Sequence, residues 1–190
     1  DKTLEILNSY NDSIIILNHY KNRWQWAALE TWFEYIRRYS NNKYIITFDA
    51  DGQHDLNDLS NFITTLDNNN EIDIVLWSRF ITKTNTNVSL SRKIILKLWI
   101  LFTFFISNIK LTDAHNWYRV FRREILSKMK ITIDWMWHAS EIVDVIANNK
   151  IKFKEVPVNI KYTEYSLSKW QKSSNAINIA IKMIWTKFFK

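Results

Sequence analysis

The chain has 190 residues, of which 47% are apolar and 24% charged, a balance that is ordinary for a globular domain and excludes disordered, collagen-like and low-complexity classes. It contains no cysteine, which excludes disulfides, a thiolate metal site and a cysteine nucleophile. Lys and Arg number 26 against 19 Asp and Glu, a net charge of +7, which suits a phosphate-bearing ligand, a nucleic acid or an anionic membrane without choosing among them. We expect one domain over residues 1–190.

The first half of the chain alternates β-branched runs with helical patterns. Residues 1–7 lack the basic start and apolar run of a signal peptide. Short apolar runs predict buried strands, and apolar residues at helical spacing predict helices. In chain order these are a strand over 13–17, a helix over 25–39, a strand over 44–48, a helix over 57–66 and a strand over 72–76. The Asn/Thr-rich residues 82–89 are typical of a loop.

The second half contains the most apolar segment, residues 94–109. It predicts a buried helix or, alternatively, a helix on a membrane surface whose cations, within and beside the segment, face lipid phosphates. Those cations are Arg92, Lys93, Lys97 and Lys110. No uncharged apolar stretch reaches the about 18 residues of a spanning helix. Further predictions are a helix over 141–147, a strand over 151–160 around Pro157 and a helix over 175–189. The alternation predicts an α/β fold, with a mostly parallel sheet and helices on both faces.

Two charged clusters follow predicted strands, at the place where α/β sheets bind ligands. Asp49 and Asp51 come directly after the second strand, and two carboxylates in this spacing can flank one Mg²⁺ against substrate phosphates. The alternative is a solvated turn, because Asp and Gly are common in turns. Ser78 and Arg79 follow the third strand, and the planar guanidinium suits phosphate, although a surface arginine is the alternative. His54 receives no proton-transfer role.

With these pieces in order, the sequence resembles the nucleotide-sugar glycosyltransferases of family 2. It is most similar to the branch that includes dolichol-phosphate mannosyltransferase and bacterial polyprenyl-phosphate glycosyltransferases. The segments that carry the resemblance are residues 48–54 with Asp49-Ala50-Asp51, 77–80 with Ser78-Arg79, 112–123, 139–142, 155–158 and 165–170. The resemblance implies a GT-A fold and inverting transfer from a nucleoside-diphosphate sugar to a polyprenyl phosphate. It also implies a cytoplasmic protein that is peripheral at the inner face of the membrane.

The resemblance further implies roles for particular residues. Asp49 and Asp51 would hold Mg²⁺ or Mn²⁺ against the donor diphosphate, with Gln53 beside the metal or the sugar. Arg79 and Arg92, supported by Ser78, would bind the acceptor phosphate. The remaining assignments are Asp113 to sugar or loop positioning, Glu141 to sugar hydroxyls, and Ser168 and Lys169 to a segment over the diphosphate. The acceptor phosphate is already anionic near neutral pH, so no strong general base is expected.

The sequence departs from the family pattern in two ways. The family's first two strands would precede the residue at which this chain opens, so we expect N-terminal strands to be missing. Tryptophan also stands where the family has glycine, and an indole at such sites would obstruct close backbone approach or a positive φ. We interpret these tryptophans as UGA codons that some bacteria read as glycine. The positions are Trp24, Trp26, Trp32, Trp77, Trp117, Trp135, Trp137 and Trp170.

Three alternative functions remain open. A family 2 transferase can act on a saccharide acceptor in cell-envelope synthesis rather than on a lipid phosphate. The chain can also be an inactive relative, or a basic module that binds nucleic acid. Against nucleic acid, the acidic cluster over residues 49–58 would repel a phosphate backbone, so we expect no nucleic-acid partner.

Overall fold

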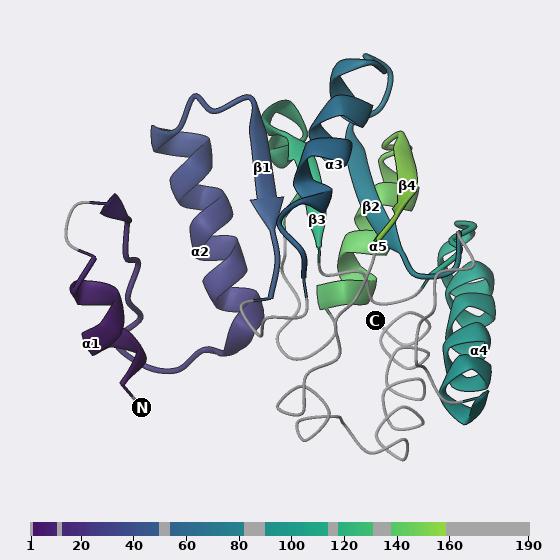
Figure 1. Cartoon of the computed structure of the whole chain (residues 1–190), viewed down its shortest axis with the longest axis horizontal. Helices are drawn as coiled ribbons and strands as arrows, with labels where there is room; N and C mark the ends of the chain where they lie inside the picture. The colour runs from purple at the N-terminus through teal and green to yellow at the C-terminus, as the bar shows by residue number, and fades with distance from the viewer. Residues whose placement is uncertain are drawn as a thin grey trace.

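The structure is a computed structural model that describes residues 2–10, 13–49, 54–81, 90–113, 118–130 and 138–158 (Figure 1). The predicted loop at 82–89 and the predicted helix at 175–189 lie outside the described residues. The elements in chain order are α1 (Thr3–Asn8), α2 (Trp24–Tyr39), β1 (Tyr44–Thr47), α3 (Asp58–Asp67), β2 (Ile74–Ser78), α4 (Leu90–Ser107), β3 (Arg119–Arg122), the 3₁₀ helix η2 (Arg123–Ser127), α5 (His138–Asn148) and β4 (Phe153–Pro157).

The described strands form one sheet in the order β1-β3-β2-β4. β4 is parallel to β2, but β3 is antiparallel to both β1 and β2. Three strands therefore point the same way, yet two of the three described pairings are antiparallel, so the prediction of a mostly parallel sheet is wrong for these pairings. The reason lies in the connection before β3. It is held at the carboxyl end of β2, where Thr112 and Ser78 contact each other, and a strand that enters from that end runs against β2.

The two faces of the sheet carry separate apolar clusters, because successive side chains of a strand point to opposite faces. Ile74 and Leu76 of β2 pack with Phe33 of α2 and Ile142 of α5 in one cluster. The other cluster contains residues of α3, β2, β3 and β4, namely Phe62, Leu66, Val75, Trp77, Val120 and Val156, together with Tyr118 and Val158. Helices therefore cover both faces of the sheet, as predicted, with α2 and α5 on one side and α3 on the other.

Most predicted elements are confirmed within one to three residues, but the strand predicted over 13–17 is wrong. Those residues form no strand, and Ile14 and Ile15 are 37% and 54% exposed. A β-branched run becomes a strand only when a neighbouring strand bonds its backbone groups, and no described strand does so here. The elements α1, β3 and η2 were not predicted.

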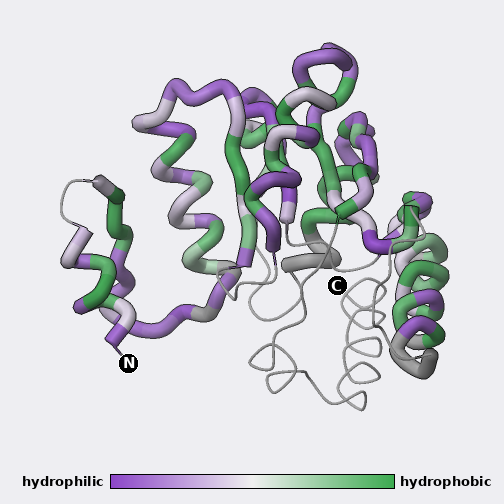
Figure 2. The backbone as a smooth tube through the Cα atoms, viewed as in Figure 1, coloured by the Kyte–Doolittle hydropathy of each residue, from purple (hydrophilic) through white to green (hydrophobic). Residues whose placement is uncertain are grey.

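Helix α4 lies beside α5, at the margin of the fold (Figure 1), and it is apolar on two sides. One side contains the buried residues Leu96, Trp99, Thr103 and Ser107. The opposite side exposes Ile94, Leu98, Leu101 and Phe105, which are 51–74% exposed. Much of α4 is green in Figure 2, in keeping with this composition. Within the residues that were described, no helix has both the length and the apolarity needed to cross a bilayer.

Candidate active site

Three of the four described strands bring their carboxyl ends to one edge of the sheet. β1, β2 and β4 point the same way, and β3 begins at this edge because it runs in the opposite direction. Asp49 lies two residues after the end of β1, and Arg79 follows β2 directly. Ligands of α/β sheets bind beyond the carboxyl ends of strands. The structure therefore places two of the predicted site residues at the expected edge.

The Arg79 side chain is bound by Asp113. Its Nε donates to Oδ2 and its Nη2 donates to Oδ1, both at 2.7 Å, while the backbone N–H of Arg79 donates to Oδ2 at 2.9 Å. The two side chains are only 8% and 0% exposed. The guanidinium also lies over the rings of Trp77 and Phe80, at 5.2 and 5.6 Å from their centroids. A two-pronged charged contact of this kind fixes direction as well as distance, so Asp113 orients Arg79.

Ser78 is fully buried at the end of β2. Its Oγ lies 2.7 Å from Oγ1 of Thr112 and accepts the N–H of Phe80 at 3.2 Å. The hydroxyl therefore joins the end of β2 to the segment before β3. Its contact with an acceptor phosphate stays a prediction.

Glu155 on β4 is a site-edge residue that the sequence analysis missed. The N–H of Thr112 donates to both carboxylate oxygens, at 3.0 and 2.9 Å, and the N–H of Asp113 donates to Oε1 at 3.3 Å. Burial raises the pKa of the Glu155 carboxyl, and hydrogen bonds from the backbone and side chain of Thr112 oppose that shift. The only sequence signal was its place in a segment that resembles the family, because its partners lie 42 and 43 residues away along the chain.

Asp49 is half-buried, and its Oδ1 accepts a hydrogen bond from Nε2 of Gln25 at 3.0 Å. Arg119 lies one strand away, opposite Thr47 of β1, and is 2% exposed. Burial lowers the pKa of Arg119 to about 10, and the negative charge of Asp49 opposes that shift. Arg119 therefore stays charged near neutral pH, so a buried cation lies close to the Asp49 carboxylate.

The donor chemistry of Asp49 fits a hard divalent cation, because Mg²⁺ and Mn²⁺ prefer carboxylate oxygens. One carboxylate at the tip of a strand leaves coordination positions for substrate phosphates. Asp51, the predicted second ligand, lies outside the described residues. In the part of the chain that is described, no group of three or more potential metal ligands is present.

The side chains of the other predicted site residues lie outside what the structure describes. Gln53, Ser168 and Lys169 lie outside the described residues, as Asp51 does. Arg92 lies in α4 and Glu141 lies in α5, but their side chains are not described. Their assignments therefore stay predictions.

An aromatic cluster lies beneath the edge. The ring of His54 is 4.9 Å from that of Tyr118 and 5.4 Å from that of Trp77. The indole Nε1 of Trp77 is buried and has no acceptor among the described residues. Positive φ angles outside glycine occur, in the described chain, only at Asn108 and Lys150. The described backbone therefore does not require glycine at Trp77, although the buried indole N–H is poorly accommodated.

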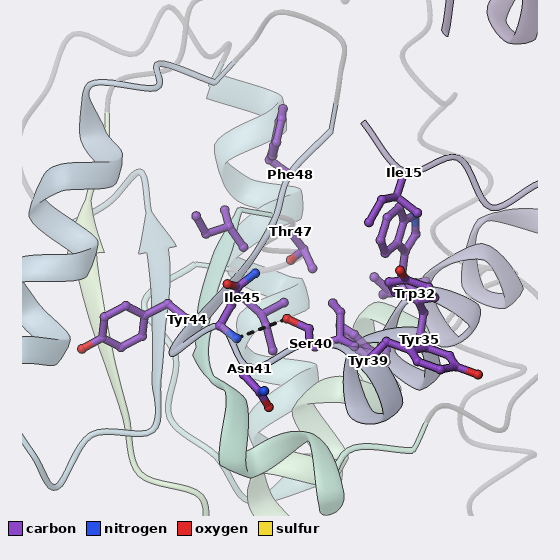
Figure 3. A pocket seen from close by; sticks show the side chains of 15 residues that line it. Ile15, Trp32, Tyr35, Tyr39, Ser40, Asn41, Tyr44, Ile45, Thr47 and Phe48 are labelled. Carbon is purple, nitrogen blue, oxygen red and sulfur yellow. Dashed lines mark hydrogen bonds between the residues drawn. The ribbon is translucent and has the colours of Figure 1, made fainter. Parts of the chain in front are cut away.

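An apolar groove of about 750 Å³ runs between α2 and β1. Figure 3 shows Trp32, Tyr35 and Tyr39 of α2 across the groove from β1, with Phe48 near the end that leads to Asp49. β1 is an edge strand of the described sheet, paired there only with β3. The groove therefore lies along β1, an outer strand among the described ones, and it reaches Phe48, the residue before Asp49.

Comparison with known proteins identifies the family. The sequence model described as glycosyl transferase family 2 matches residues 1–130. An uncharacterized protein of Methanocaldococcus jannaschii is 30% identical over 192 aligned positions, covering 100% of this chain and 77% of the relative. A UDP-N-acetylglucosamine–dolichyl-phosphate N-acetylglucosaminyltransferase of Methanococcus voltae is 27% identical over 148 positions, covering 76% of this chain and 59% of the relative. The chain belongs to glycosyl transferase family 2 and is a glycosyltransferase.

Proposed function

We propose that this glycosyltransferase moves a sugar from a nucleoside-diphosphate sugar to a polyprenyl phosphate, in a GT-A type domain that spans residues 1–190. The observation that carries the proposal is that Asp49, with buried Arg119 nearby, and the Arg79–Asp113 pair lie at the same end of the sheet, after β1 and β2. Acidic and cationic groups at one strand edge suit a metal-bound diphosphate and a second phosphate. The dolichyl-phosphate acceptor in the name of the Methanococcus voltae relative supports the class of acceptor.

The reaction needs a nucleophile, a leaving group and charge stabilisation. An oxygen of the acceptor phosphate attacks the anomeric carbon of the donor sugar, and the bond from that carbon to the diphosphate breaks. The configuration inverts, and the nucleoside diphosphate leaves with the bonding electrons. No proton has to be removed first, because the phosphate is anionic near neutral pH. The chain therefore supplies mainly orientation and charge.

Each residue group has a part in this proposal. Asp49 and Asp51 would hold Mg²⁺ or Mn²⁺, which would supply positive charge to balance that of the diphosphate. Asp113 orients the Arg79 guanidinium toward the acceptor phosphate. Ser78 supports this arrangement by joining the end of β2 to Thr112. The further proposed contacts are Arg92 with the acceptor phosphate, Gln53 near the metal or sugar, Glu141 with sugar hydroxyls, and Ser168 and Lys169 over the diphosphate.

The exposed side of α4 supports peripheral attachment to a membrane, which we place at its inner face. Leu98 and Phe105 are 60% and 74% exposed, and the exposed Lys97 lies on the same helix. A helix that combines an outward apolar stripe with cations suits the interface of an anionic bilayer. A lipid-linked acceptor is available at that interface, so attachment would raise its concentration at the site.

The decisive experiment is a transfer assay with radiolabelled sugar nucleotides. Polyprenyl phosphate and a soluble oligosaccharide are offered as separate acceptors, with Mn²⁺ or with chelator. We expect labelled lipid only with metal. Asp49→Asn should lower turnover by about 100-fold or more, the scale for losing a group that stabilises developing charge.

The matched control is Asp67→Asn. Asp67 is also a carboxylate near β1, but it is 45% exposed and pairs with Lys43 at the surface. Exposed pairs contribute little, so this variant should retain its turnover. Label in the oligosaccharide instead of the lipid, or turnover that is indifferent to chelator and to Asp49→Asn, would overturn the proposal.

A further inference from the structure

Glu155 connects β4 to the segment that leads into β3. Its two carboxylate oxygens accept the N–H of Thr112, and one of them also accepts the N–H of Asp113. Glu155 is itself held in the sheet, opposite Leu76 of β2. The carboxylate therefore fixes two consecutive backbone N–H groups of a connection against the rigid sheet.

The same connection orients the site arginine. Asp113, whose backbone is held by Glu155, binds Arg79 through both carboxylate oxygens. A hydrogen bond between the hydroxyls of Thr112 and Ser78 also holds this connection against the end of β2. A displacement of residues 112–113 would therefore move the carboxylate that sets the direction of the guanidinium.

We propose that Glu155 is a positioning residue for glycosyl transfer, acting through Asp113 to aim Arg79 at the acceptor phosphate. This inference rests on the proposed function, because it takes the acceptor contact of Arg79 from there. A carboxylate suits the task better than an amide. It offers two acceptor oxygens to Thr112, whereas a glutamine would turn an NH₂ group toward that N–H.

The electrostatics of Glu155 favour a functional reason for keeping the carboxylate. Burial raises its pKa, and the negative charge of Asp113 adds to that shift. An acid whose folded-state pKa lies above its unfolded value weakens folding at pH values where it is ionised, and the penalty disappears as pH falls below the unfolded pKa. Whenever it is ionised, Glu155 thus costs stability, which is typical of groups retained for activity.

The test measures the acceptor and donor kinetics of Glu155→Gln in the full chain. We expect kcat/KM for polyprenyl phosphate to fall by about 10- to 100-fold, the usual effect of losing an orienting partner. KM for the sugar nucleotide should stay within about twofold, because the inference places the effect on the acceptor alone. Tm should not fall, because the uncharged glutamine removes the stability cost of an ionised carboxylate at this position. Glu71→Gln is the matched control, since Glu71 is an exposed carboxylate paired with Lys152, the residue directly before β4.

A double-mutant cycle separates positioning from a structural role. If Glu155 acts through the arginine, Glu155→Gln should add little to the acceptor defect of Arg79→Lys. Additive losses, equal effects on donor and acceptor, a fall in Tm that accompanies the loss of activity, or wild-type kinetics would each overturn the inference. Failure of the proposed function is recognised separately, because the unsubstituted enzyme would then label no polyprenyl phosphate; that result would overturn the acceptor role as well.

Discussion

A guanidinium and a carboxylate that are both shielded from water depend on each other. Arg79 and Asp113 are 34 residues apart in sequence, yet they form the most buried ion pair that the structure describes. The position of Arg79 after a strand was predictable from the apolar run before it, and Asp113 was singled out because it lies in a segment that resembles the family. Their pairing was not predictable, because it depends on where α4 returns the chain. Glu155 was not identified from the sequence for the same reason, because the tertiary fold sets its hydrogen-bond partners.

Removing one member of this pair should destabilise the protein strongly. Arg79→Ala leaves the Asp113 carboxylate buried without its cation, and such losses amount to about 3–5 kcal/mol. Denaturant unfolding measures the free energy of unfolding. Lys43→Ala is the control, because its pair with Asp67 has side chains 63% and 45% exposed, and exposed pairs contribute little to stability. Similar midpoints for the two variants would contradict the expectation.

Elements with strong periodicity were predicted well, and elements that depend on neighbours were not. The helix expected over 25–39 is α2, Trp24–Tyr39, and the apolar segment 94–109 largely coincides with α4, Leu90–Ser107. Strand β3 was missed because its four residues begin and end with arginine, so they show no alternation between apolar and polar side chains. The run 13–17 has the composition of a strand, but no described strand pairs with it.

The exposed side of α4 gives a prediction about membranes. Leu98→Glu should weaken binding to vesicles that contain an anionic phospholipid by at least about tenfold, since burying one leucine contributes about 1.5–3 kcal/mol. Vesicle sedimentation measures the binding. Leu56→Glu is the control, because Leu56 is 64% exposed, against 60% for Leu98, and precedes α3 rather than lying in α4. Equal binding by the two variants would exclude α4 as the contact.

At the scale of the molecule, the α/β class and the coverage of both sheet faces by helices followed from the alternation of elements. The direction of β3 did not follow, because a short strand takes its direction from the end at which the chain enters the sheet. The same geometry brings the carboxyl ends of β1, β2 and β4 and the start of β3 together at one edge. A site assembled from four such segments can be located from sequence, but its internal contacts require the fold.

The edge position of β1 has a consequence for handling this 190-residue chain. Backbone groups along an outer strand, beside a groove lined by aromatic rings, can template pairing with another molecule. We expect reversible, concentration-dependent self-association in sedimentation velocity. Ile46→Lys, which puts a charge on β1 at a residue that is 36% exposed, should shift the population toward single molecules, whereas Leu56→Lys should not. A sedimentation coefficient that is constant across concentrations would show that β1 does not pair with a second molecule in solution.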